Sequence, residues 1–131
     1  MSGTSLLLDT NVAIDFLAGE EGAVSFLNDA LKKESVIAVS QITRIELLSY
    51  PDISDEEQTK VKSFLDGIEV ILITEEVEAR AIEIRRRNRL KLPDALILAT
   101  AIACESTLVS NDSQLIRADI PGATVLKIGQ G

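Results

Sequence analysis

Short apolar runs, separated by segments whose apolar residues recur at helical spacing, limit most strongly how this chain can fold. The runs occupy residues 5–8, 36–39, 70–73, 108–109 and 124–128, and they are too short for helices. Strands that alternate with helices need crossover connections, which make the strands parallel and place helices on the faces of the sheet. We therefore predict an α/β fold with a mainly parallel, about five-stranded sheet that is flanked by helices on both faces.

The helix boundaries are predicted by residues that start and stop helices. Gly19 separates the first two helices, and Ser54 with Glu57 forms a capping-box pattern at the start of a later one. Thr74 is the expected N-cap of a long helix whose last turns are basic. Pro93 is expected to open an almost wholly apolar helix. These signals give the order of elements that the predicted sheet requires.

The length and composition predict one domain in the cytoplasm. A chain of 131 residues of which 46% are hydrophobic can bury one core, so we expect a single domain over residues 1–131. No apolar run approaches the roughly 18–20 residues that cross a bilayer. The opening Met1-Ser2-Gly3-Thr4-Ser5 has no cationic segment leading into a secretion-type apolar stretch. We expect a cytoplasmic protein without a membrane partner.

The absence of histidine restricts the chemistry that the chain can perform. With no histidine and only one cysteine, Cys104, the sequence excludes the usual zinc cages and every serine–histidine or cysteine–histidine device. Cys104 also has no partner for an internal disulfide. Any catalysis must therefore use carboxylates, lysine, hydroxyl groups or a bound ion.

Four acidic residues from four separate segments are expected to converge. Asp9 follows the first apolar run and Asp112 follows the fourth, so both lie at the carboxyl rim of the predicted sheet. Glu46 stands beside Ile45, which we place on the apolar stripe of its helix, so its carboxylate is expected on or against the core-facing side. Asp94 begins the largely apolar helix and is expected to point into the same crevice.

Each of these acids also has a simpler structural interpretation. Asp9 and Asp112 suit helix caps, and Asp94 suits the first turn of a helix, where the dipole favours an acid. Glu46 would then form a salt bridge with an arginine. Taken together, the four acids favour a shared site over four separate structural roles.

Four carboxylates at one site need a compensating cation. Two carboxylates about 4 Å apart repel by roughly 4 kcal/mol at an effective dielectric constant near 20. Oxygen ligands without histidine or paired cysteine favour Mg²⁺ or Mn²⁺, and hydrated sites of this kind usually act on phosphate. We therefore predict phosphoryl hydrolysis, with Thr10, Asn11 and Ser110 as supporting groups that orient a carboxylate or a metal-bound water.

The four acids stand in four motifs, which are, in order, Leu6-Leu7-Leu8-Asp9-Thr10-Asn11, Ile45-Glu46-Leu47, Pro93-Asp94-Ala95-Leu96-Ile97-Leu98-Ala99-Thr100-Ala101 and Leu108-Val109-Ser110-Asn111-Asp112. These motifs resemble those of the PIN-domain nucleases, most closely the small VapC-type toxins of prokaryotic toxin–antitoxin pairs. The resemblance covers nearly the whole chain and implies a single PIN-like nuclease domain. It further implies a Mg²⁺- or Mn²⁺-dependent endoribonuclease whose catalytic and metal-binding quartet is Asp9, Glu46, Asp94 and Asp112.

The resemblance also implies partners. As a toxin, the chain would cleave RNA, pair with a cognate antitoxin protein whose segment covers the crevice, and form homodimers. The net charge of −8 opposes RNA binding at long range, but bases concentrate between Arg80 and Lys91. We expect RNA contacts from Arg85, Arg86, Arg87 and Arg89. The alternative for these arginines is a solvated helix end.

Three alternatives to a nuclease remain open at this stage. A PIN-like module that binds a partner without catalysis would carry the same fold. A phosphate-accepting receiver domain also gathers acids at strand ends, but it needs paired acids near the first strand and a lysine after the last one, whereas Lys127 lies inside the last predicted strand. An aspartate-nucleophile phosphatase needs a second aspartate where Asn11 stands.

Overall fold

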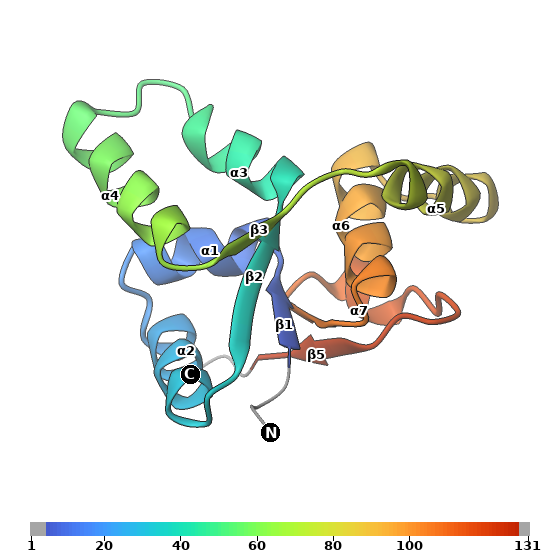
Figure 1. Cartoon of the computed structure of the whole chain (residues 1–131), viewed down its shortest axis with the longest axis horizontal. Helices are drawn as coiled ribbons and strands as arrows, with labels where there is room; N and C mark the ends of the chain where they lie inside the picture. The colour runs from blue at the N-terminus through green and yellow to red at the C-terminus, as the bar shows by residue number, and fades with distance from the viewer. Residues whose placement is uncertain (1–4, 129–131) are drawn as a thin grey trace.

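The computed structural model describes residues 5–128 and shows one parallel sheet between two layers of helices (Figure 1). Over these residues, five strands pair side by side, all in parallel. They are β1 (Ser5–Leu8), β2 (Val36–Ser40), β3 (Glu69–Ile71), β4 (Thr107–Ser110) and β5 (Val125–Lys127). The predicted α/β class and the five-stranded parallel sheet are confirmed. The opening residues 1–4, considered above for a targeting signal, lie outside the described residues.

Helices cover both faces of the sheet, as predicted. Over residues 5–128 they are α1 (Thr10–Leu17), α2 (Glu21–Lys32), α3 (Gln41–Leu48), α4 (Asp55–Asp66), α5 (Glu75–Arg87), α6 (Leu92–Ala103) and α7 (Ser113–Arg117). The first four lie on one side of the strands and the last three on the other (Figure 1). No helix among residues 5–128 is long and apolar enough to cross a membrane.

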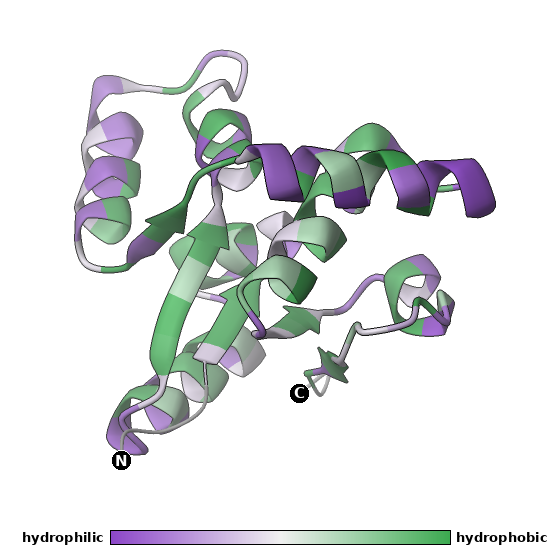
Figure 2. Cartoon of the chain, turned by 45° about the vertical axis from the view of Figure 1, so that its right-hand side comes forward, coloured by the Kyte–Doolittle hydropathy of each residue, from purple (hydrophilic) through white to green (hydrophobic). Residues whose placement is uncertain are grey.

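The alternation of side chains along the strands builds two separate cores. Leu7 packs with α5, α6 and α7, whereas its neighbours Leu6 and Leu8 pack with α1, α2 and α4. Figure 2 shows apolar residues concentrated in the strands, while α5 mixes polar and apolar residues along its length. On the face of the sheet that α1, α2 and α4 cover, the rings of Phe16 and Phe64 pack with 5.5 Å between their centroids and join α1 to α4.

Most of the predicted helix signals are confirmed. Gly19 follows α1 with a φ of +79°, a conformation that an L side chain rarely adopts, and so allows the turn into α2. The side chain of Ser54 accepts a hydrogen bond from the backbone of Glu57, whose carboxylate in turn accepts one from the backbone of Ser54. Thr74 caps α5 by accepting from the backbone of Val77, 3.2 Å away.

Two local predictions are wrong. The third strand ends at Ile71 and not at residue 73, because the amide of Ile73 donates to the side-chain oxygen of Gln41 at 2.9 Å instead of continuing the ladder. The placement of Ile45 on the core-facing stripe of α3 is also wrong, because its side chain is 49% exposed. The buried residues of α3 are Thr43 and Leu47.

The strand order places the ends of β1 and β4 side by side. The order is β3-β2-β1-β4-β5, so the chain winds outward from β1 to one edge and from β4 to the other. The two halves of the sheet meet between β1 and β4, where helices leave toward opposite faces. Ligands bind beyond the carboxyl ends of the strands at such a switch point. In this chain, Asp9 and Ser110 stand there.

Candidate functional site

Asp9 is fixed at the end of β1 by three hydrogen bonds. Its amide donates to the carbonyl oxygen of Val109 in the neighbouring strand at 2.9 Å. One carboxylate oxygen accepts from the amide of Thr10 at 2.8 Å, which caps α1. The other oxygen accepts from the hydroxyl of Ser110 at 2.8 Å. The capping role predicted for Asp9 is thus confirmed, and the same carboxylate is buried at the switch point.

Glu46 is held by a chain of hydroxyl groups that the sequence analysis did not identify in full. The hydroxyl of Thr10 donates to a carboxylate oxygen of Glu46 at 2.7 Å. Because that hydroxyl has only one hydrogen, the 2.8 Å contact between Thr10 and Thr43 must use the hydrogen of Thr43. The order of donation is therefore Thr43 to Thr10 to Glu46. The partner that the structure gives Glu46 is a hydroxyl group, and not the arginine of the simpler interpretation.

Asp94 and Asp112 lie at the N-terminal ends of two helices. Asp94 lies in the first turn of α6, next to Pro93. Asp112 caps α7 by accepting from the amide of Gln114 at 2.8 Å. The amide of Asp112 itself donates to the hydroxyl of Ser110 at 3.0 Å, so Ser110 links Asp112 with Asp9. Both predicted helix-terminal roles are confirmed.

A cavity of about 420 Å³ lies between these segments. Three of the four predicted acids line it, together with two of the predicted supporting residues. The lining residues are Asp9, Thr10, Asn11, Ile14, Glu46, Ser49, Tyr50, Pro51, Pro93, Asp94 and Ile97. Asp112 and Ser110 do not line this cavity. Ser110 donates a hydrogen bond to Asp9, and Asp112 is hydrogen-bonded to Ser110. Tyr50 and Pro51 were missed because the turn after α3 carries no motif that marks them.

The carboxylates influence one another, and this is visible in their pKa values. Burial raises the pKa of Asp9 from 3.8 to about 6. The hydrogen bond from Ser110 opposes this shift, while the negative charges of Asp94 and Asp112 add to it. Burial likewise raises the pKa of Asp94, and the charges of Asp112 and Glu46 raise it further, with Lys91 acting against them. The positive charge of Lys91 thus does not outweigh burial and the neighbouring carboxylates at Asp94.

The oxygen donors suit a hard divalent cation, although the carboxylates are not arranged as a complete coordination site. The acidic groups offer only oxygen atoms, and the buried Oδ1 of Asn111 has no hydrogen-bond partner among the described residues. Within residues 5–128, however, no three acidic side chains meet at one point in a geometry that could hold an ion. Binding of a cation would therefore have to draw the carboxylates together.

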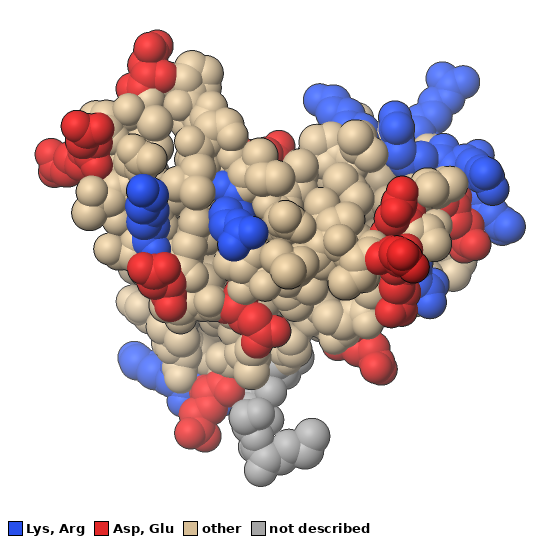
Figure 3. All heavy atoms as spheres, turned by 45° about the horizontal axis from the view of Figure 1, so that its top comes forward, with Lys and Arg blue, Asp and Glu red and all other residues tan. Residues whose placement is uncertain are grey.

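The four arginines that were predicted to contact RNA lie away from the acidic cavity. Arg85, Arg86 and Arg87 form the last turn of α5, and Arg89 follows in the connection to α6. Figure 3 shows basic side chains gathered over this end of the molecule. Arg85, Arg86 and Arg89 line a second cavity, which is separated from the acidic one by the first turns of α6. The RNA contact itself stays a prediction.

The comparisons with known proteins point to one family. A family model described as PIN domain matches residues 6–121. Ribonuclease VapC19 of Mycobacterium tuberculosis is 30% identical over 111 residues, covering 81% of this chain and 87% of that protein. VapBC2 from Rickettsia felis, solved bound to a DNA fragment from its promoter, matches with a TM-score of 0.82 at 25% identity over 95% of this chain and 98% of that one.

A toxin–antitoxin complex from Klebsiella pneumoniae gives a similar result. It matches with a TM-score of 0.76 at 28% identity and covers 91% of this chain and 95% of that chain. The family model and the relative each span most of the sequence, and they agree with the fold. The chain therefore belongs to the PIN-domain family.

Proposed function

We propose that this chain is a Mg²⁺- or Mn²⁺-dependent endoribonuclease and the toxin component of a toxin–antitoxin pair. The observation that carries the proposal is the cavity at the switch point, which is lined by Asp9, Glu46 and Asp94 and in which burial and neighbouring carboxylates raise the pKa values of Asp9 and Asp94. The similarity to Ribonuclease VapC19 supports the same reaction. The strand order disfavours a receiver domain, because receivers use the order 2-1-3-4-5.

The residues divide into ligands and groups that hold the ligands. We assign Asp9 and Asp94 as principal metal ligands, Asp112 as a ligand through water or at a second ion, and Glu46 as a ligand or as the group that orients the attacking water. When bound, a divalent ion neutralises phosphate charge and makes a water acidic enough to act as a nucleophile near neutral pH.

The remaining residues orient these groups. Ser110 and the amide of Thr10 fix both oxygens of Asp9, so that its carboxylate cannot rotate. The hydroxyl of Thr10 holds Glu46 at the cavity wall. Asn11 lines the same cavity from an exposed position, where it is available to the substrate or to a water. No protein base is required in this scheme, which agrees with a chain that has no histidine.

Cleavage of RNA by purified protein tests the proposal. We expect cleavage in Mg²⁺ or Mn²⁺, none in a chelator, and a loss of about 100-fold or more for Asp94→Asn. Asp29→Asn, an exposed acid of α2, serves as the matched control and should leave the rate unchanged. If wild type binds Mn²⁺ in calorimetry but cuts no RNA, the alternative of a PIN-like module without catalysis is correct.

The proposed partners are an RNA substrate, an antitoxin protein and a second copy of the chain. An antitoxin segment is supported by the toxin–antitoxin complexes among the structural matches. It is also supported by a groove of about 380 Å³ that shares Ile14, Tyr50 and Pro51 with the acidic cavity and is otherwise formed by α1, α3, α4 and the α3–α4 turn. A segment bound there would block the cavity, so the cognate protein should abolish RNA cleavage at a 1:1 ratio.

A further inference from the structure

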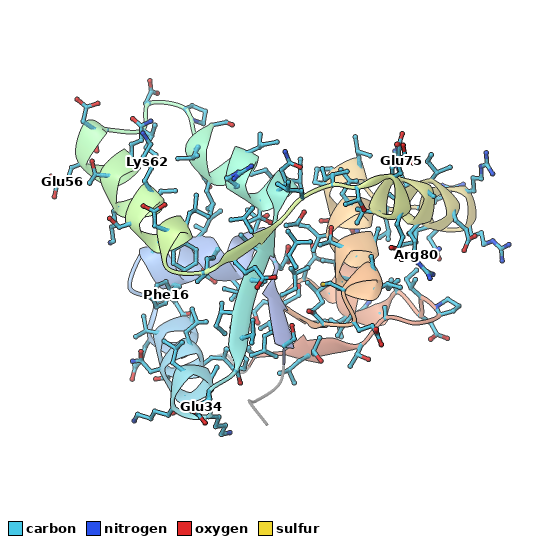
Figure 4. All side chains as sticks on the ribbon, viewed as in Figure 1. Phe16, Glu34, Glu56, Lys62, Glu75 and Arg80 are labelled. Carbon is cyan, nitrogen blue, oxygen red and sulfur yellow. The ribbon has the colours of Figure 1, made fainter. Side chains whose placement is uncertain are left out.

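The aromatic residues of the chain are divided between the core and the acidic cavity. The sequence has three phenylalanines, one tyrosine and no tryptophan. Phe16, Phe26 and Phe64 pack against the core that α1, α2 and α4 share, and Phe16 lies between these three helices (Figure 4). Tyr50, by contrast, is 52% exposed and lines the acidic cavity. Among residues 5–128, Tyr50 is therefore the aromatic side chain that a ligand in this cavity can reach.

The backbone of Tyr50 is held by the turn that joins α3 to α4. Its carbonyl oxygen accepts a hydrogen bond from the amide of Ile53 at 3.3 Å. Pro51 occupies the second position of this turn, and Asp52 occupies the third with a φ of +60°, which is the pattern of a type II turn. A residue before proline is also restricted to an extended backbone. The backbone that carries the ring is thus ordered before a ligand binds, which lowers the entropy cost of binding.

Tyr50 stands where two chemically different hollows meet. On one side lies the acidic cavity of about 420 Å³, to which the proposed function assigns the divalent ion and the scissile phosphate. On the other side lies the groove of about 380 Å³, whose lining includes the apolar Leu17 and Leu47. Ile14, Tyr50 and Pro51 line both. A nucleotide is divided in the same way, because it joins a charged phosphate to a base with two flat apolar faces.

Stacking is the kind of base contact that this boundary offers. Among the described residues that line the acidic cavity there is no lysine or arginine, so cationic side chains do not hold the substrate at this point. An aromatic ring binds a base without needing charge, and such stacking is the common way in which proteins hold single-stranded nucleic acid. The exposed ring of Tyr50 is suited to this contact.

We propose that Tyr50 is a specificity-determining residue whose ring stacks on the base next to the scissile phosphate. The inference rests on the proposed function and adds to it the contact that holds a base of the substrate. Only an unpaired base exposes its face to a side chain, so the RNA is single-stranded at this point. Because every base has such a face, the ring selects for the presence of a base there more than for its identity.

Steady-state cleavage of a short single-stranded RNA that the wild type cuts tests the role of Tyr50. We expect Tyr50→Ala to raise KM about 10- to 100-fold, because the stacked base is lost. The kcat should stay unchanged, since the stack is equally strong in the ground state and in the transition state. Tyr50→Phe keeps the ring and should restore KM. Leu31→Ala, which shortens an exposed apolar side chain of α2, is the matched control and should leave KM unchanged.

Removing the base from the RNA is the complementary experiment. Two RNAs are made, each with an abasic nucleotide on one side of the cleaved bond. With wild type, one of them should raise KM as much as Tyr50→Ala does with the intact RNA. With Tyr50→Ala, the same abasic RNA should cause no further rise, because both changes remove one contact. The measurement on wild type needs no variant, so it decides the question even if Tyr50→Ala does not fold.

Fluorescence provides a readout that does not depend on cleavage rates. Because the chain has one tyrosine and no tryptophan, its tyrosine emission comes from Tyr50 alone. Rapid mixing of wild type with the intact RNA in Mg²⁺ should quench this emission before cleavage, whereas the abasic RNA that raises KM should not. Calorimetry should show that Tyr50→Ala binds Mn²⁺ like wild type, because the variant leaves the acidic residues in place.

Four results would overturn the inference. A wild-type KM in Tyr50→Ala would exclude the stack, and a lower kcat at unchanged KM would assign Tyr50 to the arrangement of the metal ligands. If Tyr50→Phe is as poor as Tyr50→Ala, the hydroxyl group and not the ring is used. A normal KM together with lost inhibition by the antitoxin would assign Tyr50 to that partner. All four leave RNA cleavage by wild type in place, whereas a wild type that cuts no RNA contradicts the proposed function itself.

Discussion

Asp9 carries a carboxylate in a buried position, with only 3% of its surface exposed. Its pKa is raised from 3.8 to about 6 chiefly by that burial. Between these two values the folded state binds more protons than the unfolded chain, so the stability of the ion-free protein falls as pH rises through this range. The buried carboxylate therefore destabilises the fold at neutral pH.

Removing this charge is expected to stabilise the protein. The difference in free energy of unfolding between Asp9→Asn and wild type should grow by about 2 kcal/mol in favour of the variant between pH 4 and pH 7, measured in a chelator. This follows because one pKa unit corresponds to 1.36 kcal/mol. Urea unfolding of both proteins across this range measures the difference. A gap between the two curves that does not widen with pH would contradict the burial of a charged Asp9.

Thr43 is a second residue whose role can be tested individually. It is fully buried, and its hydroxyl donates to Thr10, which in turn holds Glu46. Thr43→Val keeps the shape but removes this donor, so we expect a loss of about 1 kcal/mol of stability and a three- to tenfold drop in the kcat for RNA cleavage. Thr43→Ser keeps the hydroxyl and should restore kcat. Equal kcat values for the two variants would exclude a positioning role.

Helices and strands could be predicted from the sequence where residues within the element itself determine its ends. The end of β1, the place of Asp94 in the first turn of α6 and the cap at Asp112 follow from local patterns, and parallel pairing alone brings Asp9 beside Ser110. Interactions that depend on how one element is rotated against another could not be predicted. The hydrogen-bonded path from Thr43 to Glu46 depends on how α3 is rotated against α1. The sequence pattern placed Ile45 toward the core and so indicated a different rotation, whereas the side chain of Ile45 is exposed.

The helix α4 offers a prediction at the scale of one element. Its capping box satisfies two backbone amides through Ser54 and Glu57. Ser54→Ala should therefore cost about 1 kcal/mol of unfolding free energy. Ser63→Ala lies in the exposed interior of the same helix and should change stability by less than about 0.5 kcal/mol. Equal free energies of unfolding for both variants in urea would show that the cap does not stabilise the helix.

For the whole molecule, cation binding and stability must be coupled. An ion that binds the folded chain alone stabilises it by about 2.7 kcal/mol at 100 times its dissociation constant. We expect Mn²⁺ to raise the melting temperature of wild type and of Asp29→Asn, but not of Asp94→Asn. Differential scanning calorimetry with and without Mn²⁺ makes the comparison. An equal rise in Asp94→Asn would place the binding site outside the acidic cavity.

The bond between Ser110 and Asp9 joins residues that are 101 positions apart. Protein synthesis is vectorial, so Asp9 leaves the ribosome long before β4 exists to receive it. Until then the growing chain lacks Ser110 and Asp112, and β1 lacks one of its two neighbours. A polypeptide whose translation stops before Asp94 carries only two of the four acids, Asp9 and Glu46, so we expect such an incomplete product not to cleave RNA.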